Sequence, residues 1–165
     1  MLSKFFEFIK YLLGKTSELG ELEAKDAFLG KTVVDIHLKR THSEFKMVPL
    51  FNLKQIHAID RDNAIQATEK RVETLLSAKD RLLDKKEITR EVLAEYLPSV
   101  SWIKVVKQDD DSYISYEGNG RLVALQKVFS PEDEINVEVE EYYFKNPKVI
   151  LRQMLKVRKL NGFVN

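Results

Sequence analysis

Hydrophobic positions recur with two different periods along this chain, and their succession predicts a mixed α+β protein. From residue 2 to residue 13 the apolar residues repeat at helical spacing, with lysine and glutamate opposite them, which predicts an amphipathic helix. Residues 14–31 hold three glycines among charged residues, so we expect a linker with at most one short helix. Strand signals then follow at Thr32–Leu38, so we expect a strand there.

The middle of the chain predicts one further strand and two helices. Met47–Ile56 has strand character, and Pro49 favours an edge position or the first residues of that strand. Apolar residues at helical spacing predict a long helix over Asp60–Leu83. A short helix follows, because Thr89 is a good N-cap residue and Pro98 ends the pattern.

The last third predicts a hairpin, a helix, a strand and a basic helix. Trp102–Val106 and Ser112–Tyr116 flank a polar turn and form the hairpin. The next helix is expected over Leu122–Phe129, and a half-exposed strand begins at Ile135. Lys148–Leu160 closes the chain as a helix. Because strands and helices are mixed along the chain, the expected architecture is a small α+β domain.

Composition narrows the class of protein. The chain has 165 residues, of which 44% are hydrophobic and 32% charged, enough for one domain with a real core. The formal net charge of +1 argues against nucleic-acid binding through overall charge alone. The sequence contains no cysteine, which excludes disulfides, thiol nucleophiles and cysteine metal sites. Glu7 and Lys10 interrupt the apolar N-terminal stretch, so we expect no signal peptide, no membrane span and a cytoplasmic location.

The most informative motif is a glycine corner in the last third of the chain. The strand pattern of Tyr113–Tyr116 runs into a turn with Gly118 and Gly120, and a helical pattern opens at Arg121. A helix start presents unpaired backbone N–H groups, where an anion can bind. Glycine allows a ligand to approach the backbone, and a guanidinium can donate two hydrogen bonds to phosphate or carboxylate oxygens. The corner therefore predicts a phosphate-binding site.

Other patterns give weaker indications. Two Gly-Lys-Thr triplets lack the earlier glycine of a P-loop, because Ile9 and Lys25 occupy that position. The three histidines have no shared ligand spacing, so no metal site is expected from them. A run of basic residues follows an acidic stretch near the C-terminus. It is either a solvated face or a surface for nucleic acid or an acidic partner, through Lys156, Arg158 and Lys159.

The glycine corner and its surroundings resemble the ParB/sulfiredoxin superfamily. In that family a Gly-x-x-Arg-x-x-Ala box follows a strand and opens a helix, and Gly118, Arg121 and Ala124 match it. The likeness covers roughly residues 45–144. It implies a ParB/sulfiredoxin-like domain over residues 32–144, with a small mixed sheet and packed helices, between an N-terminal helix and linker (1–31) and a basic C-terminal helix (145–165).

The resemblance also implies a function and sets limits on it. Sulfiredoxin activity needs a cysteine in the box, which this chain lacks. The chain after Phe144 is too short for the helix-turn-helix domain of ParB. The function that the resemblance still implies is nucleotide or phosphate binding. If the protein is an enzyme, we expect an ATP- or CTP-dependent phosphotransferase or hydrolase that uses Mg²⁺. The residues expected to bind phosphate are Gly118, Asn119, Gly120, Arg121 and Arg61, and the candidate catalytic carboxylates are Asp60, Asp62 and Glu117.

A non-enzymatic interaction module is the alternative hypothesis. In this interpretation the glycine turn is structural and Arg121 pairs with a carboxylate such as Glu117. The terminal helices would then mediate partner binding or form a homodimer.

Overall fold

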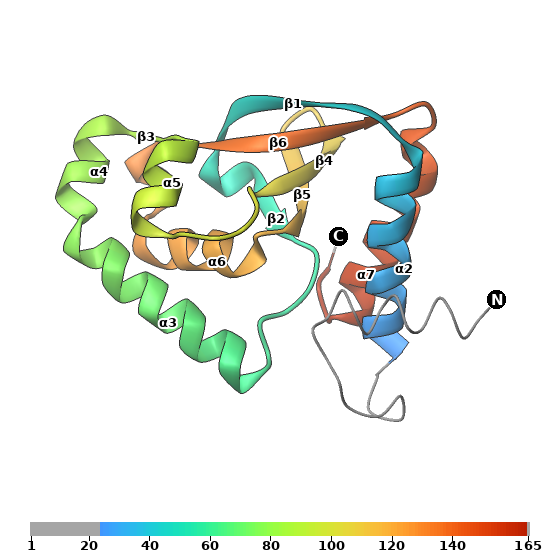
Figure 1. The fold of residues 1–165 in the computed structure, drawn as a ribbon, viewed down its shortest axis with the longest axis horizontal. Helices are drawn as coiled ribbons and strands as arrows, with labels where there is room; N and C mark the ends of the chain where they lie inside the picture. The colour runs from blue at the N-terminus through green and yellow to red at the C-terminus, as the bar shows by residue number, and fades with distance from the viewer. Residues whose placement is uncertain (1–23, 165) are drawn as a thin grey trace.

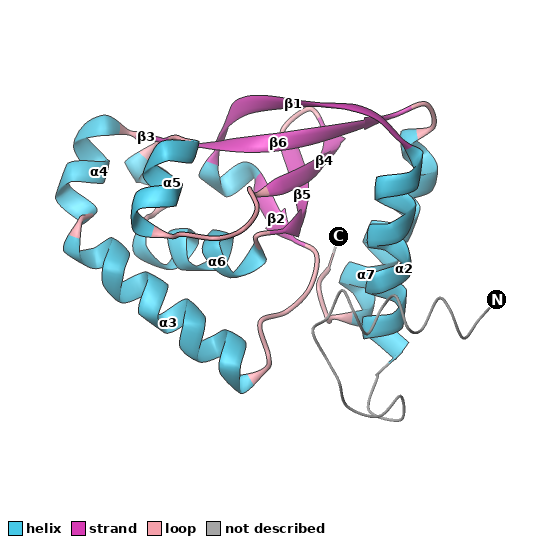
Figure 2. Cartoon of the chain, in the orientation of Figure 1, coloured by secondary structure: helices cyan, strands magenta, loops and turns pink. Residues whose placement is uncertain are grey.

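A six-stranded mixed sheet lies between two groups of helices in the computed structural model, which describes residues 24–164 (Figures 1 and 2). The strands are β1 (Arg40–Pro49), β2 (Leu53–Gln55), β3 (Glu87–Ile88), β4 (Lys104–Asp109), β5 (Ser112–Glu117) and β6 (Asn136–Phe144). The helices are α2 (Ala24–Lys39), α3 (Asp62–Ser77), α4 (Lys79–Lys85), α5 (Arg90–Tyr96), α6 (Asn119–Val128) and α7 (Pro147–Leu160). Two short 3₁₀ turns, η2 (Leu50–Asn52) and η3 (Pro131–Asp133), complete the order. The predicted α+β class is confirmed.

The strands run in the order β1-β6-β4-β5-β2, and β3 pairs with the first residues of β6. β1 with β6 and β4 with β5 are antiparallel pairs, whereas β4 with β6 and β2 with β5 are parallel pairs. β5 has a strand on each side, and every residue from Ser112 to Tyr116 is buried. The chain leaves β5 directly into α6, so the start of α6 is held by the most deeply buried strand of the sheet.

Two hydrophobic cores cover the two faces of the sheet. α3, α4, α5 and α6 contribute to the first core, through side chains such as Leu75, Leu93 and Leu122. α2 and α7 contribute to the second, through Ile36 and Met154. The basic C-terminal helix therefore buries its apolar face within the chain.

Several predicted elements are confirmed. Thr89 caps α5, and its side-chain oxygen accepts a hydrogen bond from the Val92 N–H at 3.4 Å. The hairpin is β4–β5, and the last helices and strand are α6, β6 and α7. The amphipathic helix expected at residues 2–13 lies outside the described residues. Within residues 24–164, no helix is both long enough and apolar enough to span a membrane.

Three predictions were wrong in the first half of the chain. Residues 32–38 are helical and belong to α2, which also contains residues 24–31 of the segment expected to be a linker. Thr32 and Ile36 lie one helical turn apart, and both are buried. The predicted strand 47–56 is interrupted by η2, so it contributes the end of β1 and all of β2. The predicted helix 60–83 is two helices that meet at Ala78.

Candidate anion-binding site

The glycine corner between β5 and α6 has a backbone that only glycine adopts readily. Gly118 has φ +85°, and a Cβ at this position would lie 3.0 Å from Cγ1 and 3.1 Å from Cα of Ile103. The first hydrogen bond of α6 joins the Leu122 N–H to the Gly118 carbonyl at 3.0 Å. The N–H groups of residues 119–121 precede this bond and have no partner inside the helix. They form the backbone part of the candidate site.

Arg121 is the unusual side chain of this corner. Only 3% of it is exposed, and no hydrogen-bond acceptor in the described part of the chain reaches its Nη2 atom. Burial lowers the pKa of Arg121, the nearby charge of Arg71 lowers it further, and Glu117 acts in the opposite direction. The Glu117 carboxylate itself forms an ion pair with Lys104 at 3.1 Å. Arg121 therefore carries a buried charge that the described chain leaves without an ion-pair partner.

The wall opposite the corner is one face of α3. Ala64, Ala67, Thr68 and Arg71 lie three or four residues apart, so they share this face, and all four line a pocket of about 500 Å³. Thr68 is buried, and its hydroxyl donates to the Ala64 carbonyl at 2.8 Å. The small residues allow α3 to approach α6, so that Arg71 reaches the helix start.

The absence of a side chain at Gly120 leaves space for the guanidinium of Arg71. A Cβ at position 120 would lie 2.6 Å from Nη1 of Arg71 and 3.5 Å from the hydroxyl of Thr68. Arg71 is half-buried, and it forms no ion pair within residues 24–164. Ser99 and Ser101, from the loop between α5 and β4, complete this part of the pocket. Two arginines thus border one pocket beside an unpaired helix start.

The predicted phosphate-binding residues fall into two groups. Gly118, Gly120 and Arg121 line the pocket, as does Glu117. Asn119 also lines it, but its side-chain oxygen accepts a hydrogen bond from the Ile56 N–H at 3.1 Å and ties the corner to the end of β2. The side chain of Asn119 is therefore used within the fold, and its backbone N–H is the group left for a ligand.

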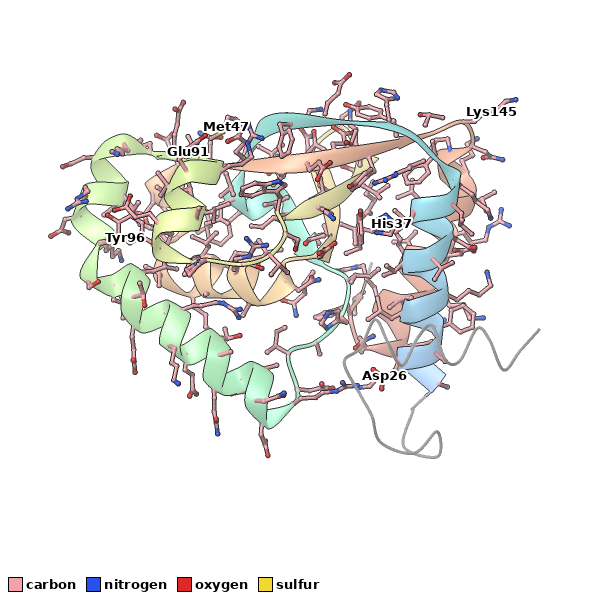
Figure 3. All side chains as sticks on the ribbon, in the orientation of Figure 1. Asp26, His37, Met47, Glu91, Tyr96 and Lys145 are labelled. Carbon is pink, nitrogen blue, oxygen red and sulfur yellow. The ribbon has the colours of Figure 1, made fainter. Side chains whose placement is uncertain are left out.

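The other predicted residues belong to the loop before α3, where an adjacent pocket of about 240 Å³ is lined by Asp60 and Arg61. Arg61 forms an ion pair of 2.9 Å with Asp26, at the start of α2 (Figure 3). Asp60 accepts a hydrogen bond of 2.6 Å from Lys25, and this bond lowers the pKa of Asp60. Asp62 is exposed in the first turn of α3 and lines neither pocket. The structure therefore places these three residues beside the arginine pocket rather than in it.

Arg71 was not among the predicted site residues. Its contact with the corner depends on the packing of α3 against α6, which no local pattern specifies. One signal was present in the sequence, namely the small residues Ala64 and Ala67 on the same helical face as Arg71. Small residues on one face permit a close helix–helix approach, and a polar residue one turn further then lies at the contact.

Of the three α7 residues predicted to contact nucleic acid, Arg158 is buried, whereas Lys156 and Lys159 are exposed. Arg158 is 6% exposed, donates from Nη1 to the Gln55 carbonyl, and lies 4.9 Å from the ring centroid of Phe163. Lys156 is exposed, with Nζ 4.0 Å above the ring centroid of Phe28. Arg158 therefore stabilises the junction of α7 with β2. It is not exposed as the central cation of the predicted nucleic-acid surface.

The metal-ligating residue types are dispersed in the described part of the chain. No group of three histidine, aspartate or glutamate side chains in residues 24–164 is arranged to hold a metal ion. His37 points from α2 toward the sheet, with ring centroids 5.9 Å from Tyr116 and 6.1 Å from Tyr142 (Figure 3). His42 stacks on Tyr143 at 4.5 Å. Tyr116 also lines the arginine pocket, as does the third histidine, His57.

Comparisons of the chain with protein-family models, curated proteins and solved structures gave no match. The ParB/sulfiredoxin resemblance therefore stays a prediction.

Gly118→Ala is expected to lower the free energy of unfolding by about 1–3 kcal/mol, because the new side chain adds the strain of a left-handed backbone and contacts Ile103. Denaturant titration measures the loss. Gly162→Ala is the matched control, since Gly162 has φ +82° but no atom within 4 Å of the added Cβ. Equal losses in the two variants would contradict a packed corner at Gly118.

Proposed function

We propose that the pocket between α3 and the start of α6 binds the phosphate group of a nucleotide or of another phosphorylated ligand. One observation carries the proposal. Arg121 is 3% exposed, and the second arginine of the pocket increases the free energy of keeping it charged. A buried cation without a counter-charge is strongly unfavourable. A bound anion relieves this penalty and the repulsion between the two arginines together.

Phosphate fits this pocket better than a carboxylate does. The N–H groups of residues 119–121 and the positive end of the α6 dipole meet one side of the anion. Arg121 donates two hydrogen bonds in a fixed fork, and Arg71 approaches from α3 on the other side. A phosphate has three or four oxygens that can accept from these separate directions, whereas a carboxylate has two in one plane.

Binding, rather than a metal-dependent reaction, is the function that the side chains support. Of the residues that line the pocket, Glu117 is the one carboxylate, and it already pairs with Lys104 at 3.1 Å. Mg²⁺ prefers several oxygen ligands, so this donor set does not fit a magnesium ion held by the protein. The proposed roles of Asp60, Asp62 and Glu117 as catalytic bases stay predictions, and we derive no reaction step from them.

Thermal unfolding with added ligands tests the proposal. ATP, CTP, GTP and inorganic phosphate, each with and without Mg²⁺, serve as probes. We expect at least one of them to raise the melting temperature, since a ligand at 100 times its Kd stabilises by about 2.7 kcal/mol. Arg152→Met removes an exposed arginine of α7 and is the control that should keep the effect. No rise with any probe, or a rise that Arg152→Met removes, would contradict binding in this pocket.

Gly120→Ala is expected to weaken binding of the stabilising probe by tenfold or more and to leave the protein slightly more stable. The added Cβ would lie 2.6 Å from Nη1 of Arg71, so the flexible arginine must move away from the helix start. Alanine is favoured over glycine in a helix by about 0.5–1 kcal/mol, which raises the stability of the free protein. Isothermal titration calorimetry and denaturant titration measure the two effects. Unchanged affinity would show that Arg71 does not contact the ligand.

A further inference from the structure

β1 is the outermost strand of the sheet and has an unusually regular free edge. It pairs with β6 on one side, and within residues 24–164 no strand pairs with its other side. Its regular pairing begins at His42, after a register irregularity, and Pro49 ends it because proline has no N–H to donate. Almost all of its residues are exposed up to Lys46. A long exposed edge of this kind is a template for another strand.

We propose that β1 pairs with β1 of a second copy of the chain, antiparallel and symmetric about Phe45. In a symmetric antiparallel pair, one residue lies opposite its own copy, and the pairs are arranged evenly around it. The regular part of β1 runs from His42 to Val48, and Phe45 is its midpoint. Symmetry about Glu44 or Lys46 would place two like charges opposite each other, which is destabilising.

The side chains of β1 are complementary in this register. Glu44 of each copy lies opposite Lys46 of the other, which places opposite charges across the new strand pair. Lys46 already forms an ion pair with the buried Glu141. The charge of Lys46 therefore does not oppose the pairing of the two β1 strands. The Tyr143 hydroxyl donates to Glu141 at 3.0 Å and lies 3.4 Å from Glu44, which places Glu44 beside this pair.

The opposite face of β1 supplies apolar contacts. Phe45 and Met47 are each 39% exposed, and Figure 3 marks Met47 near the end of β1. The Arg90 guanidinium lies 3.8 Å above the ring of Phe45, whose centroid is 6.4 Å from that of Trp102. In the proposed register Phe45 meets its own copy and Met47 meets Ser43. Aromatic, methionine and arginine side chains are those enriched in the centres of protein interfaces.

Cysteine cross-linking tests the proposed register directly, because the natural chain has no cysteine that could form another disulfide. Phe45→Cys places one thiol opposite its own copy, within the 4.4–6.8 Å range of Cα distances that a disulfide spans. Ser43→Cys is the matched control, since its two thiols would be about 13 Å apart along the strand pair. Sedimentation of the wild-type protein over a range of concentrations measures the dimer without any substitution.

The proposal predicts a concentration-dependent wild-type dimer. It also predicts disulfide dimers of Phe45→Cys under mild oxidation, at protein concentrations where Ser43→Cys forms no disulfide cross-link. The combined variant Ser43→Cys with Met47→Cys should again cross-link. A wild-type protein that is monomeric at every concentration overturns the proposal, and this is the result expected if residues 1–23 cover the edge instead. Equal cross-linking of Phe45→Cys and Ser43→Cys overturns the register.

Discussion

Arg121→Met is expected to raise the free energy of unfolding of the ligand-free protein by about 1–3 kcal/mol. Methionine has a similar volume and fills the space of the buried side chain without a charge. Replacement of buried charges by well-packed apolar side chains is often stabilising by 1–4 kcal/mol. A gain rather than a loss is expected because Arg121 has no counter-charge in the described chain and lies near a second arginine. Denaturant titration without phosphate in the buffer measures it.

The same variant is expected to lose the stabilisation that phosphorylated probes give the wild-type protein. A side chain that stabilises the ligand complex but destabilises the free protein contributes to binding. A structural residue would instead stabilise the free protein. Arg152→Met is the control, because this exposed arginine should change neither quantity. If Arg121→Met instead unfolds the protein, or lowers its stability by several kcal/mol, the arginine is structural, as in the interaction-module hypothesis.

Lys46→Met is expected to lower the free energy of unfolding by about 3 kcal/mol at neutral pH. Removing one partner of a buried ion pair typically has this effect, since the other charge stays buried without an opposite charge. Here the remaining charge is Glu141, whose side chain is 3% exposed. Lys107→Met is the matched control, because Lys107 pairs with the fully exposed Asp110 and should contribute little. Equal effects of the two substitutions would contradict a buried pair at Lys46.

The pH dependence of this difference follows from the pKa of Lys46. The hydrogen bond with Glu141 is the largest cause that raises this pKa above its ordinary value of 10.5. A raised pKa means that the contribution of Lys46 is complete below pH 10.5 and is lost as the pH rises through the folded value. The difference between wild type and Lys46→Met should therefore be constant from pH 7 to about pH 10 and decrease only above pH 10.5.

The glycine corner was predictable because its signals are local. An alternating apolar strand, a glycine that must adopt positive φ, and a helical pattern follow one another directly at residues 113–125. The cap of α5 at Thr89 was predictable for the same reason. In each case the backbone geometry is set by residues within one turn of each other.

The wrong predictions have causes that act over longer distances. The β-branched residues Thr32, Val33 and Val34 favour a strand locally, but packing of α2 against α7 and the sheet makes them helical. β1 was missed in its first half because polar, exposed residues from Arg40 to Glu44 give no apolar alternation. Arg71 joins Arg121 only through the packing of two helices distant in sequence. The sequence therefore predicted the α6 side of the pocket, with Arg121, but not the α3 side, with Arg71.

The most direct test of phosphate binding is a ¹H–¹⁵N NMR titration of the full-length protein with pyrophosphate and with ATP. Phosphate binding at this corner should give saturable downfield shifts of the backbone N–H signals of residues 119–121, because these groups donate to the bound phosphate. The side-chain Nε–H signals of Arg71 and Arg121 should move with the same midpoint, and none of these shifts should occur in Arg121→Met. Shifts that are absent from residues 119–121 and largest at Lys156 and Lys159 of α7 would rule out phosphate binding at the glycine corner, and would favour the basic helix as the anion-binding surface.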